Sequence, residues 1–255
     1  MTIQSSSPAL TGLLQKARGE LARGQFDAAA TTLESVLAKA PDCAPAMGMA
    51  AIAAQMRGKH GDAVAFFHKA IAQQSQDAGL HAGLGISLFE SGDVEGAVTA
   101  LRRACELAPN IASGWFNLGR ALKLQVRTDE AIDALRRALQ IDPVHVSARL
   151  TLADALASVG ETDAAASELR CVLKAHPGQA RAWFALANLK VVPISAEEAA
   201  LLRRNFEQVA VPVEDRVLFG FALARALEDQ DDHVASFEVL QQASRLQRQR
   251  VHWDA

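Results

Sequence analysis

The feature that most constrains this chain is a 34-residue period. An alanine recurs at this interval five times, and four further columns keep the same step. The columns are Ala29, Ala63, Ala97, Ala131 and Ala165; Gly24, Gly58, Gly92, Val126 and Gly160; Pro41, Ser75, Pro109, Pro143 and Pro177; Leu33, Phe67, Leu101, Leu135 and Leu169; and Val36, Ala70, Ala104, Ala138 and Val172. A period of this length indicates a repeat protein in which each unit packs against its neighbours.

The unit spanning residues 112–145 illustrates what the columns encode. Two runs of packed residues at helical spacing flank a turn near Val126. They are Trp115, Leu118, Gly119 and Leu122 in the first run and Ala131, Leu135 and Ala138 in the second. The small side chains of Gly119 and Ala131 let two helices approach closely, and Pro143 marks the end of the second helix. Such a hairpin cannot bury its apolar face alone, so the sequence predicts an all-α solenoid.

This order of residues resembles the tetratricopeptide repeat (TPR) family, whose pattern runs aromatic, Leu-Gly, large apolar, Gly, Ala, large apolar, Ala and Pro. The third unit matches it with Leu84, Gly85, Leu88, Gly92, Ala97, Leu101, Ala104 and Pro109. The resemblance covers Leu10 to Gln179 as five units, and residues 1–9 are expected to be disordered. It implies an all-α, right-handed TPR superhelix (an α-solenoid) of about five regular and two degenerate helical hairpins.

Three positions depart from the family pattern. His60 and His233 stand where an aromatic residue normally precedes the second helix, and packing is the favoured interpretation of both. Val126 replaces the turn glycine. If that position requires a positive φ, a β-branched residue there is strained by roughly 1–2 kcal/mol. Otherwise the turn has been rebuilt.

The period breaks after Lys190, so residues 180–255 are expected to form degenerate TPR units with an insert helix. Pro193 ends a sixth first helix. The sequence from Ser195 to Glu198 is typical of a capping box, which predicts a new helix through about Gln208. A further hairpin follows, with helices near 214–229 and 232–250. Its packed positions are Leu223, Ala224, Leu227, Ser236, Leu240 and Ala243.

The same tail carries a second, narrower resemblance. It is similar to the junction in bacterial proteins that fuse N-terminal TPRs to a C-terminal sulfotransferase domain. The matching segments are 183–190, 221–229 and 245–254. The resemblance implies that this chain is the substrate-recruiting region of a sulfotransferase that uses 3′-phosphoadenylyl sulfate (PAPS), with the catalytic domain following Ala255. The absence of an evident closing helix before Trp253 favours this hypothesis slightly. The alternative is a stand-alone TPR adaptor that assembles a cytoplasmic protein complex.

Composition excludes several other classes of protein. The net charge of −3 argues against nucleic-acid binding, which usually requires a basic face. The longest apolar run, residues 44–54, is too short to span a membrane, and residues 1–10 lack the basic start of a secretory signal. Three sparse cysteines indicate no disulfide framework. A cytoplasmic location is therefore expected.

No motif for chemistry emerges from the sequence. There is no phosphate-binding loop and no His/Cys cluster at metal-ligand spacing. We therefore predict no catalytic residue, no metal and no cofactor in this chain, with PAPS entering only if a sulfotransferase domain follows. The paired arginines at 102–103 and 136–137 are interpreted as a solvated outer face.

The concave groove is the predicted functional surface. Because first helices line this groove in TPR proteins, the family's groove offsets give a set of candidate peptide-binding residues. They are Leu14, Arg18, Phe89, Phe116, Asn117, Arg120, Lys123, Asp154, Phe184 and Asn188. This mixture of apolar groups and polar donors suits an extended or helical peptide that crosses the fourth to sixth repeats. Only fragments of the family's carboxylate clamp occur. Packing of the phenylalanines and pairing of Arg120 and Lys123 with acids such as Asp154 remain alternatives.

Overall fold

The computed structural model describes residues 8–191 and 193–250, which form fourteen helices and no strand. The chain divides into two compact units, Met1–Pro143 and Val144–Ala255, and this division falls within the run of regular repeats. Within the described ranges, every helix is too short or too polar to cross a bilayer. The expectations for residues 1–7, Val192 and Trp253 concern positions outside those ranges.

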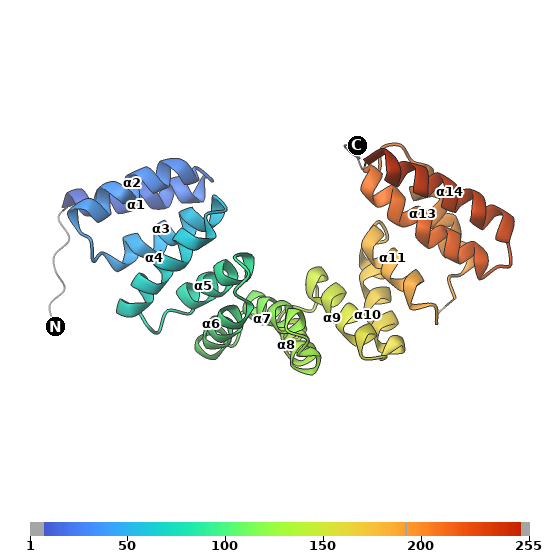
Figure 1. Ribbon diagram of the computed structural model, residues 1–255, viewed down its shortest axis with the longest axis horizontal. Coiled ribbons are helices and arrows are strands. Elements are labelled where there is room, and N and C mark those ends of the chain that lie inside the picture. The colour runs from blue at the N-terminus through green and yellow to red at the C-terminus, as the bar shows by residue number, and fades with distance from the viewer. Residues whose placement is uncertain (1–7, 192, 251–255) are drawn as a thin grey trace. The chain divides into compact units, whose positions relative to one another are not determined.

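The first unit is a series of four helical hairpins, each packed on the next (Figure 1). Its helices are α1 (Pro8–Ala22), α2 (Phe26–Lys39), α3 (Ala44–Met56), α4 (His60–Gln73), α5 (Ala78–Glu90), α6 (Val94–Leu107), α7 (Ala112–Leu124) and α8 (Thr128–Ile141). The disorder expected at residues 8 and 9 is wrong, because α1 already begins at Pro8. Proline suits this first helical turn, where its missing N–H has no partner to lose.

The second unit begins as a regular hairpin and then departs from the repeat. Its helices are α9 (Val146–Ser158), α10 (Thr162–Ala175), α11 (Ala180–Leu189), α12 (Ala196–Glu207), α13 (Val213–Glu228) and α14 (His233–Arg250). α11 packs against α10 and α13, whereas α12 packs against α13. α12 is therefore an insert helix, and α13 and α14 form the last hairpin (Figure 1).

The start of α12 is fixed by its capping residues. The Ser195 hydroxyl accepts a hydrogen bond from the backbone N–H of Glu198, and the Glu198 carboxylate accepts one from the N–H of Ser195. This is the reciprocal pairing of a capping box. α11 ends at Leu189, and its C-cap residue Lys190 has a left-handed φ of 58°. Both features confirm that the repeat is interrupted where the sequence predicts it.

Small residues at one crossing point bring the two helices of a hairpin together. A Cβ atom added to Gly119 would lie 2.7 Å from Leu135 Cγ and 3.3 Å from the carbonyl oxygen of Ala131. A Cβ atom on Gly85 would lie 2.5 Å from Leu101 Cγ. The period alanines are fully buried: Ala29, Ala63, Ala97, Ala131 and Ala165. The predicted close approach is therefore confirmed, and the period is set by packing.

A recurring hydrogen bond joins a first helix to the segment that follows the preceding hairpin. At the same position in three first helices, a ring N–H donates a hydrogen bond to the carbonyl oxygen six residues earlier. The pairs are Trp115 with Pro109 (2.9 Å), Trp183 with Pro177 (2.8 Å) and His81 with Ser75 (3.0 Å). A carbonyl can only accept, so Nε2 of His81 carries the proton in this contact. The bond satisfies a carbonyl at a helix end.

The turn column has a positive φ in every regular repeat. The values are 72° at Gly24, 72° at Gly58, 91° at Gly92, 60° at Val126 and 84° at Gly160. The turn at Val126 has therefore not been rebuilt, and its side chain is 83% exposed. A β-branched residue in this conformation is strained, and its exposed side chain gains little from packing.

We expect Val126→Gly to stabilise the protein. Relief of the left-handed strain raises the free energy of unfolding by about 1–2 kcal/mol. The greater conformational freedom of glycine in the unfolded chain lowers it by about 0.4–1 kcal/mol. The net gain in the free energy of unfolding therefore lies between about 0 and 1.6 kcal/mol, centred near 1 kcal/mol. Urea denaturation followed by circular dichroism measures it.

Val209→Gly is the matched control, because Val209 is 85% exposed and its φ is not positive. This substitution should lower the unfolding free energy, since it changes only the freedom of the unfolded chain. Equal destabilisation by both substitutions would show that the Val126 turn is unstrained.

Candidate peptide-binding surfaces

The first candidate surface lies in the first unit, where α5 and α7 place two aromatic rings around one guanidinium group. Cζ of Arg120 lies 4.7 Å from the ring centroid of Phe89 and 5.8 Å from that of Phe116. Nη2 of Arg120 lies 3.9 Å from Oε1 of Glu90. We call Phe89, Glu90, Phe116 and Arg120 the Arg120 cluster. Both ring contacts are within the range of cation–π attraction.

The Arg120 cluster is accessible to a partner. The side chains of Arg120 and Glu90 are 38% and 44% exposed, so their ion pair contributes little to stability. Asn117 and Lys123 lie on α7 about one turn before and after Arg120, and both are half-buried. The rings orient the guanidinium, while its N–H groups and the amide of Asn117 can meet a peptide.

Five residues of this surface were identified from sequence, namely Phe89, Phe116, Asn117, Arg120 and Lys123, and the structure places Arg120 against the rings of Phe89 and Phe116. Glu90 was missed. No local rule of the sequence links Glu90, at the end of α5, to Arg120 on α7. The alternative in which Arg120 pairs with an acid is thus correct for Glu90. That exposed pair leaves other donors of Arg120 available.

Leu14 and Arg18 lie on α1, in the first hairpin of the unit. Leu14 is half-buried and packs against the core formed by α1, α2 and α3. Leu14 therefore contributes to core packing, which is the alternative given above for the apolar groove residues. Arg18 is exposed.

The second candidate surface is a pocket of about 340 Å³ in the second unit. α9 and α11 bring three predicted residues together at its edge: Asp154, Phe184 and Asn188. Its remaining lining is apolar and comes from Ala153, Ala157, Leu169, Ala185 and Leu189. The ring of Phe184 also meets that of Phe221 on α13, with centroids 6.2 Å apart and planes inclined by 56°. The pocket is large enough for one apolar side chain, with a carboxylate and an amide beside it.

A hollow on the second helices of the first unit was not predicted. It has a volume of about 530 Å³ and lies between α6 and α8, over the α7 residues Trp115, Leu118 and Leu122. Cys105 contributes to its wall. The corresponding position holds a larger aliphatic residue in four repeats: Leu37, Ile71, Leu139 and Leu173. That size difference was the available signal.

Cys105 lacks the features of a nucleophile. Burial raises the pKa of its thiol to about 11, and the nearby carboxylate of Glu106 adds to the rise. The thiol is therefore protonated at physiological pH, whereas the thiolate is the reactive form. Cys105 therefore contributes to packing as a small apolar side chain, whereas Cys171 on α10 is exposed.

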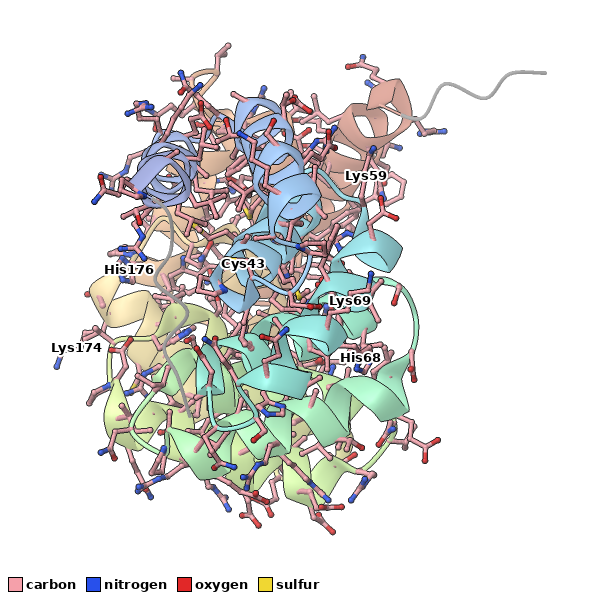
Figure 2. All side chains as sticks on the ribbon, turned by 90° about the vertical axis from the view of Figure 1, so that its left-hand side faces the viewer. Cys43, Lys59, His68, Lys69, Lys174 and His176 are labelled. Carbon is pink, nitrogen blue, oxygen red and sulfur yellow. The ribbon has the colours of Figure 1, made fainter. Side chains whose placement is uncertain are left out.

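The outer faces of the second helices carry basic residues in register. Lys69 on α4 is exposed, with Nζ 5.9 Å from the ring centroid of Phe66 (Figure 2). Arg103, one period later, donates to Glu106 Oε2 (2.9 Å) and to Gln76 Oε1 (3.1 Å). Arg102 pairs with Glu130. These contacts agree with a solvated face whose charges pair locally.

Within the part of the chain that the structure describes, no three His, Cys, Asp or Glu residues gather into a potential metal site. His60 begins α4 and is half-buried, with its Nδ1 atom lacking a hydrogen-bond partner. The packing interpretation therefore suits His60. It does not suit His233, which begins α14 and is exposed.

Sequence comparisons identify the repeat independently. Residues 14–78 and 54–115 match tetratricopeptide repeat families, and residues 89–200 match the TPR domain of cytochrome c-type biogenesis protein H. A comparison with curated proteins finds no match.

Solved structures share the fold. PilF of Pseudomonas aeruginosa is 22% identical, with 90% of this chain and 96% of PilF covered and a TM-score of 0.65. MamA of Desulfovibrio magneticus is 18% identical, with coverage of 68% and 98% and a TM-score of 0.63. YrrB, described as a TPR protein with an unusual peptide-binding site, is 19% identical, with coverage of 82% and 97% and a TM-score of 0.57. Together with the buried alanine column and the helical hairpins, the family matches establish that residues 14–200 consist of tetratricopeptide repeats.

Proposed function

We propose that this chain is a protein-binding scaffold that captures a peptide segment of a partner on its first helices. The observation that carries the proposal is the Arg120 cluster, in which two phenylalanine rings hold an accessible guanidinium group beside an amide. Arginine and aromatic residues are enriched among the residues that dominate binding energy. Phe89 also packs against the core of α6, α7 and α8, but the partly exposed Arg120–Glu90 pair contributes little to folding. Recognition is therefore the better account of the guanidinium group between the two rings.

The chemistry of the two surfaces defines the segment that fits. A carboxylate of the partner can accept hydrogen bonds from Arg120 and attract Lys123, while the rings of Phe89 and Phe116 cover an apolar side chain. In the second unit, the pocket of about 340 Å³ takes an apolar side chain, and Asp154 and Asn188 can bind backbone N–H groups beside it. We therefore expect a partner segment that mixes acidic and apolar residues. That one segment crosses from the fourth to the sixth repeat remains a prediction.

The test is the double substitution Asn117→Ala with Arg120→Ala. Peptides selected against the wild-type chain from a random phage-displayed library serve as probes, and fluorescence anisotropy measures their affinity. We expect the double variant to bind an acidic, apolar peptide about tenfold or more weakly, because a hot-spot arginine is lost.

Arg103→Ala is the control, since it removes an arginine from an outer face and leaves the first helices intact. Circular dichroism verifies that each variant is folded. Unchanged affinity in the folded double variant, or equal losses in both variants, would remove this surface from consideration.

The finer function has two candidates. In one, the chain recruits substrates for a sulfotransferase whose catalytic domain lies outside it, and the folding of residues 183–250 with an insert helix supports this candidate. In the other, it is an adaptor that assembles a protein complex in the bacterial cytoplasm. The match of residues 89–200 to a TPR domain of a biogenesis protein supports the adaptor.

In both cases we expect the isolated chain to bind neither PAPS nor zinc, because the described residues offer no metal-ligand cluster and the sequence has no phosphate-binding loop. Isothermal titration calorimetry tests this. Stoichiometric micromolar binding of either would overturn the assignment as a scaffold without chemistry. Sequencing the gene beyond the codon for Ala255 then separates the two candidates, since only the first requires a sulfotransferase domain there.

A further inference from the structure

The outer face of α14 exposes an unusual amount of apolar surface. Val234 is 75% exposed and Phe237 is 61% exposed, although they lie one turn apart on the same side of the helix. The opposite side of α14 is buried at Ser236, Val239 and Ala243. Isolated exposed apolar residues are ordinary, so the position of Phe237 in the repeat decides its meaning.

Phe237 occupies a stacking position of the repeat. It follows the positive-φ residue of its turn, Asp231, by six residues, as Val98 follows Gly92. Val98 is 4% exposed, because the next hairpin covers it through Leu118 of α7 and its neighbours. The same position on α14 carries a phenylalanine and is open. This face is thus built to receive a helix.

In a regular repeat, the first helix packs its apolar residues against the preceding hairpin. The corresponding face of α1 carries charged residues instead. Lys16 and Glu20, 3.8 Å apart, stand at the positions of Leu118 and Leu122 in α7. Glu20 is buried within the first unit, whereas the Lys16 side chain is 63% exposed and makes this end face polar, as solenoids need. Lys16 also opposes open-ended stacking of one chain's α1 on another chain's α14, because its ammonium group would be buried against Phe237.

Charge along α14 is self-complementary when the helix is inverted. Asp232 directly precedes the helix, Glu238 lies in its N-terminal half, and Arg245 and Arg248 lie in its C-terminal half. Four exposed residues and the half-buried Ser244 follow a three-four spacing along this face: Val234, Phe237, Gln241, Ser244 and Arg248. Such spacing is typical of a seam between two paired helices.

We propose that the outer face of α14 is the interface of a symmetric dimer, in which α14 pairs antiparallel with α14 of a second copy. A two-fold axis near Gln241 brings Phe237 against the aliphatic stem and guanidinium of Arg245 from the second copy. It also brings Glu238 near that arginine. The contact closes on itself, so it yields a dimer and not a filament. With one helix per subunit in the interface, the dimer is a weak one.

Sedimentation velocity over a concentration series tests the proposal. We expect reversible dimerisation of the 255-residue chain, and about tenfold or more weakening by Phe237→Lys, which places a second cation against Arg245 of the other copy. Val209→Lys is the control, because Val209 is 85% exposed and lies in the segment after α12, outside α14. A strictly monomeric chain, or a dimer that Phe237→Lys leaves intact, would overturn the proposal.

Charge reversal tests the antiparallel register. Glu238→Arg and Arg245→Glu should each weaken the dimer, because like charges then meet across the axis, whereas the double reversal should restore it. Gln241→Cys in a Cys171→Ser background should form an intermolecular disulfide with its own copy. Loss of dimerisation in the double reversal, together with no crosslink, would contradict an antiparallel α14 pair. These readouts do not involve peptide binding, so they are independent of the proposed function.

Discussion

The close approach of two helices at one crossing point determines the rest of this structure. Gly119 lies so near Leu135 that a Cβ atom could not be added without displacement, and Ala131 across from it is fully buried. Because small side chains let the two helices of a hairpin pack closely here, one face of each helix is buried inside the hairpin. The other apolar face packs against the next hairpin. This packing requirement recurs in every repeat and produces the 34-residue period of the sequence. The residues on the solvent-facing side of each first helix are not restricted by it.

That freedom explains where binding chemistry can evolve. Phe89, Phe116 and Arg120 form a cluster through contacts between adjacent first helices, although Phe89 also packs against the core. The pocket beside Asp154 and Phe184 arises in the same way within the second unit. The proposed recognition surfaces therefore lie beside the crossing points that hold each hairpin together, an arrangement that repeat scaffolds allow.

The sequence predicted the elements that local rules determine. The alanine column, the capping box at Ser195 and the end of α11 before Pro193 each follow from one short-range requirement. Contacts between side chains of different repeats were harder to predict from the sequence. The partner of Arg120 was missed because Glu90 lies on another helix, and the hollow beside Cys105 was missed because it depends on a volume that a neighbouring side chain leaves unfilled. The exposed phenylalanine of α14 could be interpreted only once its register with Val98 was known.

The measurement that tests the account most directly is the stability of variants overpacked at the crossing point. Ala97→Leu and Ala131→Leu should each lower the free energy of unfolding by about 1–3 kcal/mol, and hydrogen exchange should accelerate first in the substituted hairpin and its neighbours. Ala65→Leu, on the exposed side of α4, should change little. Unchanged unfolding free energies and exchange rates in both buried-site variants would contradict the claim that close packing at this alanine column holds the repeats together.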